Sequence, residues 1–235
     1  MGDVTSPAQA RPSALVLDWG GVLTVPLADA FGAWARTEGV APEHWADVLR
    51  SWRTLELAES GSGPGAGPVA QLERGEIAVA DFEALVAGEL ATRGSPVSEA
   101  GVLGRMLAGL DEPEPRMFEL VAAARTAGLA TALLSNSWGN TYDRTGWAEL
   151  FDTVVISGEV GMRKPEARIF ELTAKRLGVA MAACVLVDDL PWNVEGARAA
   201  GMAAVLHVDV ETTRTELERL VGVPLVCVHP QAGGS

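Results

Sequence analysis

Residues 14–24 read ALVLDWGGVLT, and the fold can be worked out from this stretch. Its first four residues are apolar, and the run stops at Asp18, Trp19 and two glycines. A short apolar run of this kind is typical of a strand that is buried on both faces of a parallel sheet. Asp18 would then lie at the carboxyl edge of the sheet, where open α/β sheets bind ligands. An ordinary turn would explain one such Asp equally well, so the later strand ends carry the argument.

The rest of the chain divides into two kinds of pattern. Apolar residues recur at helical spacing through residues 26–107, and no strand pattern interrupts them. From residue 108 onward, helical and strand patterns alternate, which is typical of a parallel sheet. We therefore predict an α/β fold with a doubly wound, Rossmann-like parallel sheet. Residues 1–25 and 108–235 would form this core, and residues 26–107 would form an inserted helical cap.

Composition narrows the class of protein. The 235 residues carry a net charge of −13, which argues against a nucleic acid or an anionic membrane surface as a partner. No apolar run approaches the roughly 20 residues that a membrane-spanning helix needs. Cys184 and Cys227 are too few for a disulfide framework, so we expect buried free thiols in a reducing compartment. The expectation is a cytoplasmic monomer or homodimer.

Three further strand patterns end in polar or charged residues, as the first one does. These residues are Ser135 and Asn136, Lys164, and Asp188 with Asp189. The carboxyl ends of parallel strands meet at one edge, so we expect all of these side chains to lie close to Asp18. A turn, a helix cap or a solvated helix start is the plainer interpretation of each of them taken alone.

The residue types in this set suit a phosphate ester bound with a metal ion. Asp18, Asp188 and Asp189 would repel one another if they packed together without a cation. Mg²⁺ prefers such oxygen ligands and leaves room for water and phosphate. Lys164 offers a positive charge and Ser135 a hydroxyl donor for phosphate oxygens, and the glycines allow backbone N–H groups to approach a ligand.

The ordered set resembles the motifs of the haloacid dehalogenase superfamily of aspartate-nucleophile hydrolases, especially its phosphatase branch with a helical cap after the first strand. Residues 18–23, 135–136, 164–165 and 187–197 are similar to the first to fourth motifs, in this order. The fourth is the most specific. Residues 72–77, LERGEI, resemble a phrase that is common in caps of this kind.

The resemblance implies a covalent mechanism. Asp18 would attack phosphorus and form an aspartyl-phosphate, which is a known role for a carboxylate. Asp18, the backbone carbonyl of Gly20 and Asp189 would hold Mg²⁺, and Asp188 would bind a metal-bound water or act as a further ligand. Ser135 and Lys164 would hold the phosphoryl group during its transfer, and the cap would be the lid that excludes water.

The resemblance also implies a substrate site for a small phosphorylated metabolite. Its predicted residues are Asp18, Trp19, Gly20, Ser135, Asn136 and Lys164. For Trp19, packing beneath the catalytic loops is the plainer alternative. Further candidate anchors in the cap are Arg36, Arg50, Arg53 and Arg74, and for these a solvated helix face is the alternative.

The chain departs from the phosphatase pattern at one position. These phosphatases usually carry a second Asp two positions after the nucleophile, as the general acid, and here that position is Gly20. General acid catalysis is worth about 10²–10⁴-fold in rate. We therefore expect a substrate with a good leaving group, such as an anomeric sugar phosphate, an aryl phosphate or an acyl phosphate. A cap carboxylate or His44 is a candidate substitute for the acid.

Two alternatives to an active phosphatase stay open on the sequence. One is a metal- and phosphate-binding scaffold that has lost turnover together with its acid. The other is a 2-haloacid dehalogenase, although dehalogenases of this superfamily carry small polar residues where this chain keeps Asp188 and Asp189.

Overall fold

The computed structural model describes residues 11–58, 67–110 and 112–226, without the side chains of residues 53–58. One five-stranded sheet lies at its centre, with every neighbouring pair parallel and the strand order β3-β2-β1-β4-β5. The strands are β1 (Ala14–Leu17), β2 (Ala130–Ser135), β3 (Thr153–Ile156), β4 (Cys184–Asp188) and β5 (Ala203–Leu206). The predicted α/β fold with a parallel sheet is confirmed.

The register brings the ends of the central strands level with one another. Leu17 of β1 pairs with Leu133 on β2 and with Val187 on β4. The backbone N–H of Asp18 continues the ladder by donating to the carbonyl of Val187 at 3.0 Å. Residues that follow these strands therefore share one carboxyl edge.

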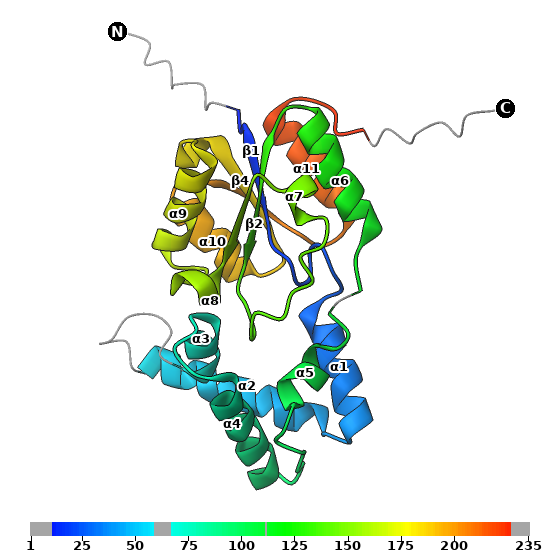
Figure 1. Cartoon of the computed structure of the whole chain (residues 1–235), viewed down its shortest axis with the longest axis vertical. Helices are drawn as coiled ribbons and strands as arrows, with labels where there is room; N and C mark the ends of the chain where they lie inside the picture. Colours follow the sequence, from blue (N-terminus) through cyan, green and yellow to red (C-terminus); the bar gives the residue numbers. More distant parts are fainter. Residues whose placement is uncertain (1–10, 59–66, 111, 227–235) are drawn as a thin grey trace, which may run out of the picture.

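Helices cover both faces of the sheet (Figure 1). Leu15 and Leu17 pack toward α6 (Pro115–Thr126), the short α7 (Trp147–Leu150) and α11 (Val210–Val221). Ala14 and Val16 point to the other face, where they pack toward α9 (Ala167–Leu177) and α10 (Pro191–Ala199). All four residues are fully buried, which is why β1 is a continuous apolar run rather than an alternating one.

In its described part, the connection from β1 to α6 contains helices and no strand of the sheet. It contains α1 (Leu27–Glu38), α2 (Pro42–Ala58), α3 (Pro68–Glu73), α4 (Val79–Thr92) and α5 (Val102–Leu107). These helices gather at the carboxyl edge of the sheet, away from the helices that cover its faces (Figure 1). A bridge between Thr24 and Pro113 joins the segments that leave and re-enter the core. We call this segment the helical insert; its exact boundaries as a cap domain stay a prediction.

The helical insert has a core of its own, which is rich in aromatic rings. Trp45 packs edge-on against Phe31, Trp34 and Trp52. These four residues are all buried. The insert thus has its own packed core, into which Trp138 from the loop after β2 also packs, so it can present a defined surface to the carboxyl edge.

Two smaller expectations concern the thiols and the membrane. Cys184 is a buried free thiol in β4, as expected, and Cys227 lies outside the described residues. Within the ranges that the structure describes, every helix is too short or too polar to cross a bilayer.

Candidate active site

The structure brings together the residues at the ends of β1 and β4 around Lys164. The Lys164 ammonium lies 2.8 Å from Oδ1 of Asp18 and 2.6 Å from Oδ2 of Asp188. Lys164 follows the short helix α8 (Ser157–Val160) after β3, and its side chain is completely buried. A buried ammonium needs such partners, because an unpaired charge away from water is very costly. The predicted convergence of these strand ends is therefore present.

The three aspartates form a group that fits a divalent cation. One carboxylate oxygen of each of Asp18, Asp188 and Asp189 lies within 4.8 Å of the others. Burial raises the pKa of Asp18, and burial together with the charge of Asp188 raises the pKa of Asp189 to about 6. Oδ1 of Asp189 is buried and accepts no hydrogen bond from the residues that the structure describes. Since an ion at this position would satisfy that oxygen and offset the crowded charge, the residues present fit a metal site.

Asp188 differs from Asp189 in that its oxygens are already occupied. Oδ1 accepts from the backbone N–H of Leu190 and from Nδ2 of Asn193, both at 3.0 Å, and Oδ2 accepts from Lys164. Asn193 was not among the residues predicted from the sequence, although it lies inside the fourth motif. Hydrogen bonds thus hold the Asp188 carboxylate in place, and it orients the Lys164 ammonium. Asp189 has the carboxylate oxygen that is still available to bind a cation.

Gly20 and Gly21 allow the backbone to pass close to this group. Gly21 has a φ of +79°, and a Cβ there would lie 2.3 Å from Oδ2 of Asp189. A Cβ on Gly20 would lie 2.8 Å from Cδ1 of Leu27, the first residue of α1. The position of the missing general acid is therefore covered by an apolar side chain of the helical insert.

Ser135 and Asn136 lie where the sequence places them, at the end of β2. The hydroxyls of Ser135 and Tyr142 lie 2.9 Å apart. The Asn136 amide spans the backbone of Lys164: Oδ1 accepts from its N–H at 2.8 Å, and Nδ2 donates to its carbonyl at 3.0 Å. Asn136 therefore fixes the loop that carries Lys164. Burial raises the pKa of Tyr142, so this phenol, which was not predicted from the sequence, stays a neutral partner of Ser135.

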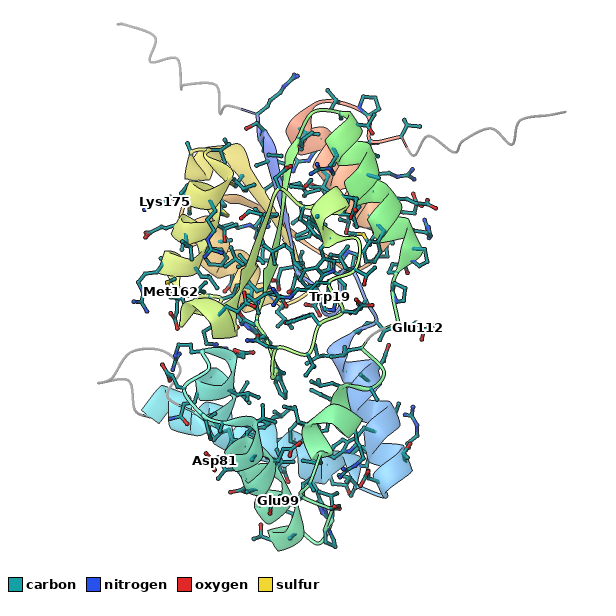
Figure 2. The ribbon with its side chains drawn as sticks, in the orientation of Figure 1. Trp19, Asp81, Glu99, Glu112, Met162 and Lys175 are labelled. Carbon is teal, nitrogen blue, oxygen red and sulfur yellow. The ribbon has the colours of Figure 1, made fainter. Side chains whose placement is uncertain are left out.

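Trp19 packs beneath the loops, as its plainer alternative predicts. Its ring lies against Phe118, Tyr142 and Trp147, at the junction between core and insert (Figure 2). Its backbone N–H contributes to the site by donating to Oδ1 of Asp18 at 2.7 Å.

Glu73, the last residue of α3, brings a carboxylate of the helical insert into the site. It accepts hydrogen bonds from Nε of Arg163, from Nε1 of Trp138 at 3.1 Å and from Nδ2 of Asn136 at 3.3 Å. Its backbone carbonyl accepts from the Ser157 hydroxyl. Burial raises the pKa of Glu73 and the charge of Arg163 lowers it. The phrase at residues 72–77 was the signal for this residue, but its role became visible only with the docking of the insert.

A cavity of about 570 Å³ opens between the sheet edge and the helical insert. Asp18, Ser135, Asn136 and Asp189 line its core side, and Glu73 and Arg163 line it nearby. The side chains that α1 and α2 contribute are apolar: Leu27, Ala28, Phe31, Ala35, Pro42, Trp45, Ala46 and Leu49. The chemistry-bearing residues thus sit at one end of an otherwise hydrocarbon-lined space.

Of the candidate substitutes for the acid, a carboxylate of the insert, Glu73, lines this cavity but is paired with Arg163, whereas His44 and those candidate arginine anchors whose side chains the structure describes do not line it. His44 is bonded through Nδ1 to the Ser95 hydroxyl at 2.9 Å and does not line this cavity. Arg74 pairs with Glu76 and Glu166, and Arg50 pairs with Asp47. Arg36 is exposed on α1. The side chain of Arg53 lies outside those that the structure describes.

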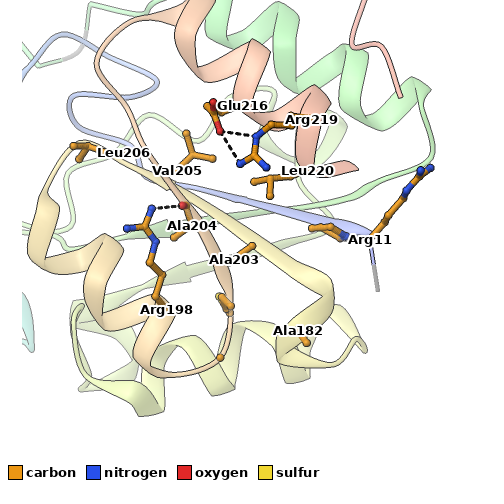
Figure 3. A pocket seen from close by; sticks show the side chains of 13 residues that line it. Arg11, Ala182, Arg198, Ala203, Ala204, Val205, Leu206, Glu216, Arg219 and Leu220 are labelled. Atoms are coloured by element: carbon orange, nitrogen blue, oxygen red, sulfur yellow. Dashed lines mark hydrogen bonds and ion pairs between the residues drawn. The ribbon is translucent and has the colours of Figure 1, made fainter. Parts of the chain in front are cut away.

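A second, larger cavity of about 660 Å³ lies beside β5 and has none of this chemistry (Figure 3). Two of the three arginines that line it already have partners: Arg198 donates to the carbonyl of Ala204 at 2.7 Å, and Arg219 pairs with Glu216 at 2.8 Å. No carboxylate cluster lines it. Size alone therefore does not mark the candidate active site.

Comparison with known proteins agrees with the geometry. The family model "haloacid dehalogenase-like hydrolase" matches residues 12–201. A sesquiterpene phosphatase from Aspergillus oryzae is 31% identical over 157 residues, which is 65% of this chain and 78% of that protein. Further curated relatives are matched over only 14% to 41% of their own length.

Solved structures share the fold at low identity. A haloacid dehalogenase family enzyme from Bacteroides thetaiotaomicron, crystallised with magnesium and inorganic phosphate, is 20% identical with a TM-score of 0.53 and covers 84% of this chain and 94% of its own. The L-2-haloacid dehalogenase of Xanthobacter autotrophicus is 22% identical with a TM-score of 0.57, over 89% and 84%. The chain is a hydrolase that belongs to the haloacid dehalogenase-like family.

Proposed function

We propose that this hydrolase cleaves small organic phosphate monoesters through a covalent intermediate on Asp18, with Mg²⁺ as its cofactor. The observation that carries the proposal is the arrangement around Lys164. A buried ammonium joins Asp18 to Asp188, while Asp189 beside them has a buried oxygen with no partner in the described part of the chain. A positive charge next to a nucleophilic carboxylate and a cation site next to both are the elements that phosphoryl transfer requires.

Each residue has a defined part in this proposal. Mg²⁺, held by Asp18, Asp189 and the Gly20 carbonyl, would offset the negative charge of the carboxylates and of the phosphate. Lys164 and the Ser135 hydroxyl hold the phosphoryl oxygens. Asn136 holds the backbone of Lys164, and Asp188 its ammonium, in place. The magnesium and phosphate complex of the Bacteroides fold relative is consistent with this site.

The reaction is a double displacement at phosphorus. An oxygen of Asp18 forms a bond to phosphorus while the ester P–O bond breaks, and the leaving oxygen keeps the electron pair and takes a proton from water. A second water then attacks phosphorus, the bond to Asp18 breaks, and inorganic phosphate leaves with the carboxylate restored. Gly20 supplies no acid for the first step, so we expect the rate to depend steeply on the pKa of the leaving group.

The first experiment compares wild type with Asp18→Asn on an aryl phosphate, with Mg²⁺ and with a chelator. We expect Asp18→Asn to lose at least about a thousandfold in kcat. Asp143→Asn is the matched control, because Asp143 is an exposed Asp that bonds only to its neighbour Thr145 among the described contacts. Acid quenching followed by peptide mass spectrometry should place the phosphate on Asp18, and calorimetry should show Mg²⁺ binding that Asp189→Ala removes.

Three outcomes would contradict the proposal or one of its parts. Binding of Mg²⁺ and vanadate without hydrolysis of any ester would show a scaffold. Release of halide from a 2-haloacid, with phosphate esters untouched, would show a dehalogenase. An unchanged rate in Asp18→Asn would remove the nucleophile assignment.

A further inference from the structure

We infer that the phosphate ester cleaved at this site is that of an apolar alcohol or phenol, whose hydrocarbon part fills the cavity under the helical insert. The inference rests on the proposed function and goes beyond it by naming the substrate class. Of the anomeric sugar, aryl and acyl phosphates expected from the sequence, it favours the aryl phosphates and adds the esters of apolar alcohols. The distribution of polar and apolar groups along the cavity wall carries it.

The polar groups of the cavity gather at its phosphate end. Asp18, Ser135 and Asp189 belong to the catalytic edge, whereas Glu73 and Arg163 are bonded to each other. The side-chain amide of Asn136 is hydrogen-bonded to the backbone of Lys164. Among the described wall residues, Oδ1 of Asp189, Oδ1 of Asn193 and Nε1 of Trp45 have no hydrogen-bond partner, and all three atoms are buried from solvent. A substrate hydroxyl placed away from the phosphate would therefore reach a partner on this wall only if the wall side chains moved.

The opposite wall is hydrocarbon. α1 contributes Leu27, Phe31 and Ala35, and α2 contributes Trp45 and Leu49. The one polar atom in these side chains, Nε1 of Trp45, is itself buried from solvent and is not accessible from the cavity. A space of about 570 Å³ lies within the range of pockets that enclose small organic ligands.

Transfer free energies decide between the two substrate classes. Each methylene group buried in such a space improves binding by about fourfold. Each hydroxyl that is buried without a partner weakens it by about tenfold or more. A sugar carries several hydroxyls, so this wall would reject it, whereas an alkyl or aryl group would gain with size until the cavity is full.

Leu27 joins this wall to the reacting centre. Its Cδ1 covers Gly20, directly beside the nucleophile. The atoms of the substrate next to the ester oxygen therefore meet a methyl group instead of an acid. A phenol suits this position because it is apolar and also leaves without protonation more easily than an alkanol.

The test uses esters that differ in polarity but hardly in leaving-group pKa. Phenyl phosphate and its 4-methyl, 4-ethyl and 4-butyl derivatives form the apolar series, and 4-(hydroxymethyl)phenyl phosphate matches the ethyl compound in size. We expect kcat/KM with Mg²⁺ to rise about threefold to fourfold per added methylene. The hydroxymethyl compound should fall at least tenfold below the ethyl compound, and glucose 1-phosphate should be poorer still.

A pair of variants localises the effect. Ala46→Phe adds a ring to the cavity wall, and Ala33→Phe makes the same change at an exposed position of α1 that does not line the cavity. We expect Ala46→Phe to lower the ratio of kcat/KM for the butyl compound to that for phenyl phosphate at least fivefold, and Ala33→Phe to keep the ratio. The ratio is independent of how much of each variant folds.

The outcomes separate the two proposals. Hydrolysis of all esters without a preference for the alkyl series, or a preference for the hydroxymethyl compound or the sugar phosphate, overturns the inference alone. If no ester is hydrolysed, the proposed function falls and takes the inference with it. An unchanged ratio in Ala46→Phe would show that the hydrocarbon binds elsewhere.

Discussion

Glu73 offers the sharpest test of how the helical insert is held to the core. Its side chain is only 8% exposed and that of Arg163 13%, so their ion pair is nearly removed from water. Trp138 and Asn136 also donate to the same carboxylate. Replacing Glu73 by Ala leaves a buried guanidinium and an indole N–H without their acceptor.

The expected cost follows from these contacts. Breaking a buried ion pair by removing one partner costs about 3–5 kcal/mol, because the remaining charge stays buried. The slight exposure of Arg163 allows some rehydration, so we expect about 3 kcal/mol for Glu73→Ala. Glu73→Gln keeps an acceptor of the same shape for Trp138 and loses only the charge, so we expect about 1–2 kcal/mol.

Urea unfolding followed by circular dichroism measures these values, and a double-mutant cycle with Arg163→Ala isolates the pair. We expect a coupling energy of about 1.5–3 kcal/mol, as for hydrogen bonds between charged groups. Glu99→Ala is the matched control: Glu99 is exposed at the far end of the insert (Figure 2), so its loss should stay within about 0.5 kcal/mol. A coupling energy below about 0.5 kcal/mol would show that this ion pair does not hold the insert to the core.

Three further predictions concern the glycine turn and one histidine. Gly20→Asp should lower the free energy of unfolding by about 1 kcal/mol, because Cδ1 of Leu27 is the end of a flexible side chain that must move aside. In thermal unfolding, Gly20→Asp combined with Leu27→Ala should cost less than the sum of the two single changes. Gly21→Ala should weaken Mg²⁺ binding more than tenfold in calorimetry, because its Cβ would displace Asp189 and its φ is positive. Burial lowers the pKa of His207 in the folded protein, so as the pH falls the unfolded chain binds this proton before the folded protein does. The free energy of unfolding should therefore decrease below about pH 6.5. His207→Gln should make this decrease smaller when unfolding is measured from pH 8 to pH 5.

The catalytic edge could be predicted from the sequence because parallel strands impose it. Once the apolar runs before Asp18 and Asp188 are recognised as parallel strands, their ends must share one edge, whatever the details of the loops. The position of Lys164 could not be predicted from strand ends alone, because a short helix separates it from β3. The motif order supplied that step, and the structure brings its ammonium to 2.8 Å from Asp18.

Glu73 and Leu27 could not be predicted in the same way. Each comes from the helical insert, and its distance from the site depends on how the insert docks. The spacing of apolar residues in the insert does not predict which face of each helix will contact the edge of the sheet. Trp19 shows the same limit from the other side: its place in the catalytic loop suggested substrate contact, but three aromatic neighbours hold its ring in the core.

The absence of the acid and the hydrocarbon wall of the cavity are two aspects of one contact. The Cβ of an acidic residue at position 20 would lie against Cδ1 of Leu27. Glycine there lets α1 begin close to the nucleophile and present its apolar face to the cavity. If the inferred substrate class is right, Gly20 is the residue that leaves room for an apolar group near Asp18, and its lack of a carboxylate is part of that site. Loss of the acid alone would not require a leucine side chain in the space beside position 20.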